Sequence, residues 1–150
     1  MKKSNLKIGL AAICLFIIDQ FSKWLVINYL KQPFELTSWF SLKYEENLGI
    51  AWSIPIPPEV IIPLNVILLG LLIFYMPRIV DLRHKESVLG LSLVIGGALG
   101  NIYDRFAHGF VVDFISIGWW PVFNLADAFL TIGIFIILLF YGTIRRHSRR

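Results

Sequence analysis

The sequence is poor in charge, in cysteine and in clustered metal-ligating residues. Charged residues make up 16% of the 150 residues, and Cys14 is the only cysteine, which excludes an internal disulfide. Because Cys14 lies in an apolar run, we expect a packed thiol. The histidines, His84, His108 and His147, are scattered, and no histidine–cysteine spacing is typical of a zinc site. We therefore expect neither a metal nor a cofactor.

The sequence also lacks the motifs of two common hydrolase classes. Neither G-x-S-x-G nor H-E-x-x-H occurs, which argues against a serine hydrolase of the first type and a zinc protease of the second. Ser22 and Lys23 are adjacent, so on a helix their side chains point in different directions. This placement argues against a Ser–Lys dyad.

Apolar residues are in excess and are gathered in long runs. They make up 57% of the chain, with a mean hydropathy of +0.70, whereas a soluble domain contains about 45–50%. Four segments approach the length of about 20 residues that a membrane-spanning helix needs: residues 8–30, 60–76, 88–103 and 125–144. The length fits a single domain over residues 1–150. The sequence thus predicts an all-α membrane protein with four transmembrane helices.

Basic residues flank these segments unevenly. They precede the first segment, separate the second from the third and follow the fourth, whereas the other two loops hold few. The positive-inside rule therefore places both termini and the middle loop in the cytoplasm. A basic C-terminus can bind nucleic acid, but its position directly after a span favours anionic lipid headgroups. We expect membrane lipids, and no nucleic acid, as partners. The flanking basic residues are Lys2, Lys3, Lys7, Arg78, Arg83, Lys85, Arg145, Arg146, Arg149 and Arg150.

A small β element is predicted in the first outer loop, about residues 31–59. Residues 40–45 alternate between apolar and polar side chains, which is strand periodicity. Residues 47–49, Asn-Leu-Gly, are typical of a turn. Trp39 and Trp52 suit the lipid–water boundary. We expect this element to lie on the outer membrane surface.

Four acidic residues in or beside the predicted spans fall toward the same side of the membrane. Asp19 lies roughly 15–20 Å along the first segment, past the midplane, at about 1.5 Å per residue. Asp104 follows the third segment, Asp127 lies near the start of the fourth, and Asp113 lies in the loop between them. Charge at membrane depth is costly and is usually retained for function. We interpret the four as one polar site near the outer leaflet.

Several members of this site also have a structural interpretation. Asp19 and Lys23 are four residues apart, which predicts an ion pair on one helix face. Asn124 followed three residues later by Asp127 resembles a capped helix N-terminus. Either interpretation explains the residues without catalysis.

Two further pairs have similar explanations. Asp104 and Arg105 can form a pair at the membrane interface. Gly96 and Gly100 have the small-xxx-small spacing that allows close helix packing. We expect packing to be the role of these glycines.

Asp113 is the hardest acid to explain structurally. It interrupts an apolar stretch, and no basic residue stands within four positions of it. Desolvation should raise the pKa of such a carboxyl. A proton shared with a second acid, such as Asp127, is the arrangement of an aspartic protease.

Five blocks of sequence contain these residues and their neighbours. In order along the chain, they resemble the bacterial lipoprotein signal peptidases, also called signal peptidase II, and the resemblance covers nearly the whole length. The blocks are residues 19–23 (Asp-Gln-Phe-Ser-Lys), 47–52 (Asn-Leu-Gly-Ile-Ala-Trp), 96–105 (Gly-Gly-Ala-Leu-Gly-Asn-Ile-Tyr-Asp-Arg), 111–114 (Val-Val-Asp-Phe) and 123–127 (Phe-Asn-Leu-Ala-Asp).

The resemblance implies a four-span aspartic endopeptidase of the bacterial plasma membrane. Such enzymes cut prolipoproteins just before a cysteine that carries diacylglycerol. The resemblance implies Asp113 and Asp127 as the catalytic pair. The second block departs from the family pattern at Ile50 and Trp52, where a small residue and a phenylalanine are usual, and this leaves substrate fit open. The implied supporting or substrate-binding residues are Asp19, Lys23, Asn47, Asn101, Asp104, Arg105 and Asn124.

Other functions stay open on the residues alone. The same acids can serve a small transporter or proton relay, and a non-catalytic assembly factor is a third interpretation. A transport path should have polar residues throughout the bilayer depth, whereas here the cytoplasmic halves of the segments are nearly all apolar. This asymmetry favours a one-sided site over a transport path. Separately, we expect the protein to act as a monomer.

Overall fold

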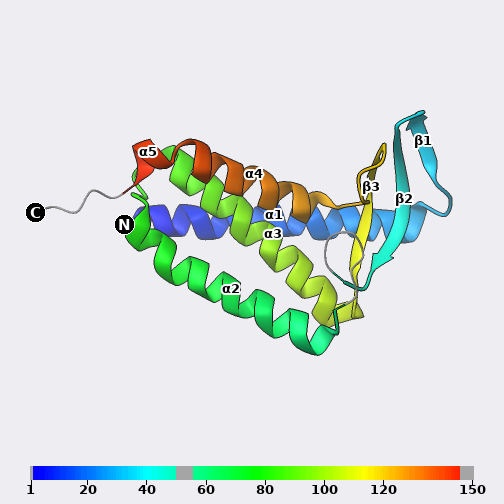
Figure 1. Ribbon diagram of the computed structural model, residues 1–150, viewed down its shortest axis with the longest axis horizontal. Helices are drawn as coiled ribbons and strands as arrows, with labels where there is room; N and C mark the ends of the chain where they lie inside the picture. The colour runs from blue at the N-terminus through cyan, green and yellow to red at the C-terminus, as the bar shows by residue number, and fades with distance from the viewer. Residues whose placement is uncertain (1, 50–55, 146–150) are drawn as a thin grey trace, which may run out of the picture.

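The computed structural model describes residues 2–49 and 56–145, and most of them are helical (Figure 1). Three helices are long and apolar enough to cross a membrane: α1 (Lys2–Tyr29), α2 (Pro58–Ile79) and α3 (Lys85–His108). A shorter apolar helix, α4 (Leu125–Leu139), is followed by the single turn α5 (Tyr141–Ile144). The predicted helical membrane architecture is therefore confirmed, and the first three helices are longer than the sequence indicates.

The fourth predicted segment, residues 125–144, is not one continuous helix. The α4 helix ends at Leu139, and the chain turns at the C-cap residue Phe140 before α5 begins. After this turn Ile144 is fully buried in a cluster with Val80, and its carbonyl accepts a 2.7 Å hydrogen bond from the backbone N–H of Asp81. The break allows the last apolar residue to cover the core instead of continuing along the helix axis.

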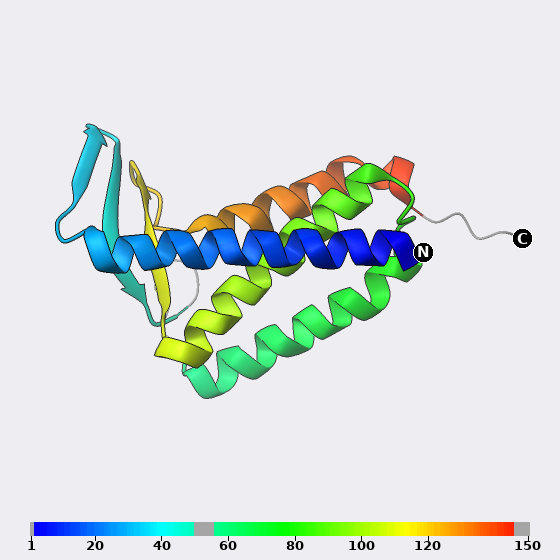
Figure 2. The same ribbon diagram turned by 180° about the vertical axis from the view of Figure 1, so that it is seen from behind.

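The α3 helix is the centre of the bundle and packs against α1, α2 and α4 (Figures 1 and 2). Small residues allow the close approach of α1, as the glycine spacing predicts. A Cβ on Gly96 would lie 2.9 Å from the carbonyl oxygen of Ala12, and a Cβ on Gly100 would collide with the carboxylate of Asp19. Gly100 thus leaves the space in which a charged side chain of α1 is buried against α3.

A three-stranded antiparallel sheet, in the order β1-β2-β3, lies at one end of the helices. The predicted β element is confirmed as β2 (Phe40–Asn47), which pairs with β1 (Phe34–Thr37). Strand β3 (Val111–Ile117) was not predicted, and the expectation that Asp113 lies in a loop is wrong. In β3, Asp113 lies opposite Glu45. The fold is therefore mostly helical with a sheet, because residues distant in sequence complete the β element.

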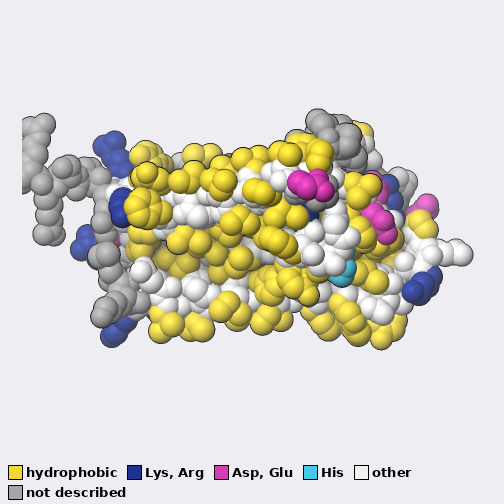
Figure 3. All heavy atoms as spheres, turned by 90° about the horizontal axis from the view of Figure 1, so that it is seen from below, with side chains coloured by type: hydrophobic (Ala, Val, Ile, Leu, Met, Phe, Trp, Pro, Cys, Tyr) yellow, Lys and Arg dark blue, Asp and Glu magenta, His cyan; other side chains and the backbone are white. Residues whose placement is uncertain are grey.

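The surface of the helices is apolar over most of its area (Figure 3). On α2, Leu64, Ile67 and Phe74 are about half exposed, as suits a helix that faces lipid. Lys and Arg side chains gather at the end that holds both termini, although some also lie at the sheet end, where most of the acidic side chains seen in this view lie. Trp39 and Trp119 are exposed at the sheet end, where aromatic side chains suit a lipid–water boundary.

Two expectations about single residues have different outcomes. Cys14 was expected to be packed, but its side chain is exposed on α1, because it lines an open groove between α1 and α3. Ile50 and Trp52, the departures from the family pattern, lie outside the described residues.

Candidate active site

The predicted site residues meet where α1, α3 and α4 reach the sheet. The nine residues come from five different elements or their ends, and six of them are buried. Helix packing and strand pairing, not sequence proximity, therefore assemble the site. Asp19 and Lys23 lie on α1, Asn47 ends β2, Asn101, Asp104 and Arg105 lie on α3, Asp113 lies on β3, Asn124 caps α4 and Asp127 lies in the first turn of α4.

Two asparagines connect the carboxylates of Asp113 and Asp127. Asn124 Nδ2 donates to Asp113 Oδ1 at 2.7 Å and to Asn101 Oδ1 at 3.1 Å. Asn101 Nδ2 in turn donates to Asp127 Oδ1 at 2.7 Å. The two acids are thus held in one hydrogen-bonded chain, Asp113–Asn124–Asn101–Asp127.

The same asparagine also begins α4, as the sequence predicts. Asn124 Oδ1 accepts from the backbone N–H of Asp127 at 2.9 Å, and Asp127 Oδ2 accepts from the backbone N–H of Asn124 at 3.3 Å. This is a complete capping box. Capping and carboxylate binding are therefore not alternatives, since Asn124 uses its oxygen for the helix and its nitrogen for Asp113.

Asp113 has the surroundings that the sequence indicates. Asp113 is only 2% exposed. Asn47 Nδ2 donates to Asp113 Oδ2, the oxygen that Asn124 does not bind, at 2.9 Å. Burial, followed by the negative charge of Asp127, raises the pKa of Asp113 to about 7, although the two asparagine hydrogen bonds and the charge of Lys23 act in the opposite direction. Asp113 is therefore able to hold a proton near neutral pH.

A second cluster surrounds the ammonium group of Lys23. Lys23 Nζ lies 2.8 Å from Asp19 Oδ2 and 2.9 Å from Asp104 Oδ2, and all three side chains are buried. The predicted ion pair within α1 is confirmed, and it extends across to α3. Asp19 Oδ1 also accepts from the backbone N–H of Ala126 at 2.9 Å, which ties α1 to the start of α4.

Lys23 links this cluster to the carboxylate chain. Its Nζ donates to Asn101 Oδ1 at 3.2 Å, the same oxygen that accepts from Asn124. With two donors on its oxygen, the amide of Asn101 is oriented so that its nitrogen faces Asp127. The charge cluster thus determines which way the bridging amide points.

The expected pair between Asp104 and Arg105 is wrong. Asp104 binds Lys23 and accepts from the backbone N–H of Val112 at 3.1 Å. Arg105 points elsewhere and donates to the carbonyl of Gly49 at 2.8 Å. Neighbours on a helix point about 100° apart, so each finds partners in a different element.

At the edge of the site, where a turn was predicted for residues 47–49, Asn47 is the last residue of β2 and its side chain closes an Asx turn with Gly49. The backbone N–H of Gly49 donates to Asn47 Oδ1 at 3.0 Å, which leaves Asn47 Nδ2 for Asp113. Arg105 holds the carbonyl of the same glycine. The turn therefore orients one of the two amides that bind Asp113.

Two polar residues of the site were not among the predicted site residues. Gln20 Nε2 donates to Asp104 Oδ1 at 2.8 Å and supports the Lys23 cluster. Asn65 lies on α2, and its side chain makes no hydrogen bond with any residue of the described part of the chain. In the sequence, only the polarity of Gln20 and Asn65 within apolar segments marks them as candidates for a site.

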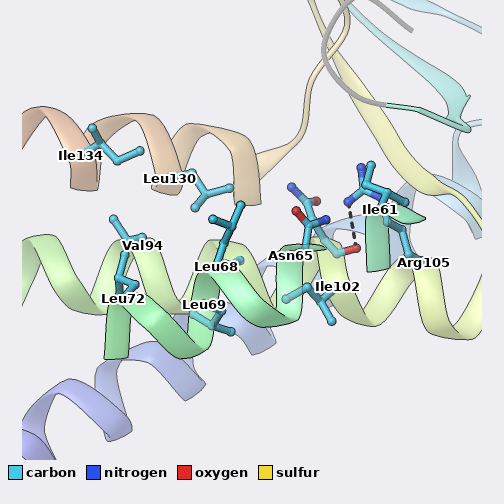
Figure 4. A pocket seen from close by; sticks show the side chains of 12 residues that line it. Ile61, Asn65, Leu68, Leu69, Leu72, Val94, Ile102, Arg105, Leu130 and Ile134 are labelled. Atoms are coloured by element: carbon cyan, nitrogen blue, oxygen red, sulfur yellow. Dashed lines mark hydrogen bonds between the residues drawn. The ribbon is translucent and has the colours of Figure 1, made fainter. Parts of the chain in front are cut away.

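An apolar groove of ≈ 370 Å³ runs from the site between α2, α3 and α4 (Figure 4). Asn101, Arg105 and Asn65 line its polar end. From there the groove continues along the helices past side chains that are nearly all apolar. These are Leu68, Leu69 and Leu72 of α2, Val94 and Ala98 of α3, and Leu130 and Ile134 of α4.

The arrangement is suited to acid–base chemistry on a neutral group. Two carboxylates that share a proton provide one base and one acid. Within residues 2–49 and 56–145, no group of three or more His, Cys, Asp or Glu side chains is placed to hold a metal ion.

The family model and the curated relatives agree on one family. The family model described as signal peptidase (SPase) II matches residues 11–143. The lipoprotein signal peptidase of Chlorobaculum parvum is 36% identical over 152 residues, covering 90% of this chain and 94% of its own, and that of Aeromonas hydrophila is 38% identical over 91% and 89%. A solved bacterial membrane enzyme superposes with a TM-score of 0.78 at 32% identity, covering 88% of this chain and 85% of its own.

Replacing Lys23 by Met should destabilise the protein strongly. Asp19 and Asp104 would remain buried without their cation, and removing one partner of a buried pair costs roughly 3–5 kcal/mol. The double change Asp19→Leu with Lys23→Met should cost less stability, because only the carboxylate of Asp104 then remains buried without a cation. Unfolding by SDS titration in mixed micelles measures both.

The exposed Lys31, at the end of α1, provides the matched control for this experiment. Lys31→Met should leave stability close to that of the wild type. A Lys23→Met protein as stable as the Lys31→Met protein would show that the buried cation does not hold α1 to α3.

Proposed function

Because this chain belongs to the signal peptidase II family and is an aspartic endopeptidase of the lipoprotein signal peptidase type, we propose that Asp113 and Asp127 are its catalytic pair. The observation that carries the proposal is the continuous hydrogen-bonded chain through Asn124 and Asn101 that joins the two carboxylates. The raised pKa of Asp113 supports a shared proton. The other buried acids, Asp19 and Asp104, share the single cation of Lys23, and we assign them a structural role.

In the proposed reaction, Asp113 carries the proton and Asp127 is ionised. Asp127 accepts a proton from water as the water oxygen attacks the scissile carbonyl carbon. Asp113 donates its proton toward the carbonyl oxygen, and a tetrahedral intermediate forms without a covalent bond to the enzyme. When the C–N bond breaks, the leaving amine takes the proton held by Asp127, and Asp113 takes back a proton from the new carboxyl group, so the pair returns to its starting state. Acid–base assistance of this kind contributes about 10²–10⁴ in rate.

The proposed substrate is a prolipoprotein whose cysteine carries diacylglycerol, cleaved just before that cysteine. The groove between α2, α3 and α4 supports this choice, because it leads from Asn101, which donates to Asp127, along side chains that are nearly all apolar. Each acyl methylene buried there contributes about 0.8 kcal/mol. Two acyl chains can therefore supply much of the binding energy and set the position of the cleaved bond.

The proposed location is the bacterial plasma membrane, with both termini cytoplasmic and the carboxylates near the outer leaflet. The protein is a multi-pass bacterial membrane enzyme. The basic side chains at the end that holds both termini support the orientation, because such residues stay on the cytoplasmic side. The substrate's lipid would then reach the site from the outer leaflet.

Asp113→Asn and Asp127→Asn should each lower the cleavage rate at least about 10²-fold, because each removes one proton-transfer group and leaves the side chain's size unchanged. The measurement is cleavage of a diacylglyceryl-modified prolipoprotein by the purified enzyme in micelles. Glu35→Gln, on the exposed strand β1, is the control and should cleave normally. A folded variant at either aspartate with near wild-type activity would refute the assignment.

The rate should also depend on pH in a defined direction. The pKa of Asp113 is raised to about 7, so above this pH the pair loses the proton that the carbonyl oxygen needs. We expect kcat/KM to fall tenfold per pH unit above about pH 7.5. Thermal unfolding at each pH separates this effect from loss of structure. Activity that stays constant to pH 9 would contradict a shared proton.

Cleavage should require the lipid on the substrate cysteine. The comparison uses one precursor with and without the diacylglyceryl group, in the same micelles. The unmodified precursor should be cut very slowly, because it loses the binding energy of the acyl chains. Equal rates would refute lipid anchoring without affecting the carboxylate pair.

Asn65→Leu should weaken binding of the lipidated substrate. Asn65 lies where the polar end of the groove meets its apolar part, the level at which the ester carbonyls would lie between the cysteine and the acyl chains. One hydrogen bond is worth about 0.5–1.5 kcal/mol, so we expect KM to rise about 2–10-fold. For a substrate with ether-linked chains, Asn65→Leu and the wild type should have the same KM. Leu68→Ala, the control, should raise KM equally for the ester and the ether substrate. An equal loss for ester and ether substrates in Asn65→Leu would exclude contact with the esters.

A further inference from the structure

A second groove lies between α1 and α3 at the end of the bundle opposite the carboxylates. Its volume is ≈ 620 Å³. It begins beside Lys7 near the start of α1 and beside Lys85 at the start of α3, and it reaches Leu15 on α1. Figure 2 shows these two helix ends together, on the side of the termini. The groove is therefore separate from the apolar groove of the proposed active site.

The mouth of this groove is basic. Lys7, Arg83 and Lys85 line it, and Arg83 is bound to Asp81, with Arg83 Nε 2.9 Å from Asp81 Oδ2. Lys7 and Lys85 form no salt bridge with any residue in the described ranges. Glu86, in the first turn of α3, does not line the groove. The side chains that line the mouth therefore carry an excess of positive charge.

The start of α3 adds to this attraction for anions. The N-cap residue His84 makes no side-chain cap hydrogen bond, so the first backbone N–H groups of a 24-residue helix lack that partner. The positive end of the helix dipole lies there. Together with two unpaired lysines, it is suited to a phosphate group.

Below the mouth the groove is apolar. Ala11, Leu15 and Leu89 line it, and the buried Leu93 lies at its floor. Ser92 is satisfied within α3, since its hydroxyl donates to the carbonyl of Val88 at 2.7 Å. From residue 7 to residue 15 a helix rises about 12 Å, close to the thickness of about 15 Å of one leaflet's hydrocarbon.

We propose that this groove binds an anionic phospholipid from the leaflet at the basic end of the bundle. The phosphate lies between Lys7, Lys85 and the N-terminus of α3, and one acyl chain lies between α1 and α3. A basic mouth above an apolar groove about one leaflet deep matches a lipid better than a soluble anion, because a soluble anion has no apolar part to fill the groove. The bound lipid would reinforce the α1–α3 contact that also carries the Lys23 cluster.

Native mass spectrometry of the purified full-length protein tests the proposal. The protein is equilibrated in micelles with equal amounts of phosphatidylglycerol and phosphatidylcholine of the same chain length. The wild type should retain phosphatidylglycerol at least about fivefold over phosphatidylcholine, and the double change Lys7→Gln with Lys85→Gln should abolish the preference. Arg78→Gln is the matched control, because Arg78 is a basic residue at the same end of the bundle that does not line the groove.

The apolar part is tested by filling it. Cys14 lines the groove, whereas its neighbour Ile13 is exposed and does not. Cys14→Trp should reduce retained lipid, and Ile13→Trp should not. Unchanged lipid retention in the double lysine variant, an equal loss in Arg78→Gln, or no difference between the two tryptophan variants would overturn the proposal. Displacement of the lipid by glycerophosphoglycerol at equal concentration would show a site for soluble phosphate esters instead.

Discussion

The buried ammonium group of Lys23 is the interaction on which the rest of this structure depends. A charge in hydrocarbon is tolerated only when it is paired, and Lys23 is paired with Asp19 on its own helix and with Asp104 on α3. Packing at Gly100 provides the space for this pairing. The requirement to neutralise one cation therefore fixes α1 against the central helix.

The same cation influences the proposed chemistry without contacting either catalytic carboxylate. By donating to Asn101 Oδ1, it orients the amide nitrogen toward Asp127. Asn124 completes the connection to Asp113 while it caps α4. Stability and proposed catalysis thus use the same side chains, and a change that disturbs Lys23 should disturb both. Such overlap is expected where polar groups are buried, because every donor and acceptor needs a partner.

The sequence predicted what depends on local pattern. Apolar runs gave the helices, the spacing of Asp19 and Lys23 gave their ion pair, and the Asn124–Asp127 spacing gave the cap. It failed where the partner is distant in sequence. Strand β3 was missed because Asp113 interrupts its apolar pattern and its hydrogen-bonding partner, β2, lies about 70 residues away. The pairing of Asp104 with Lys23, rather than with its neighbour Arg105, depends on the packing of α1 on α3.

The central claim is that Asp113 holds a proton because it is buried beside the charge of Asp127. Infrared difference spectroscopy tests it directly, since a protonated carboxyl has a carbonyl band that disappears on ionisation, and Asp113→Asn identifies which band belongs to Asp113. In the wild type this band should vanish with a midpoint near pH 7. In Asp127→Asn the midpoint should move to lower pH, because the neighbouring negative charge is gone. A midpoint in the usual carboxyl range in the wild type, or one that Asp127→Asn leaves unchanged, would contradict the account.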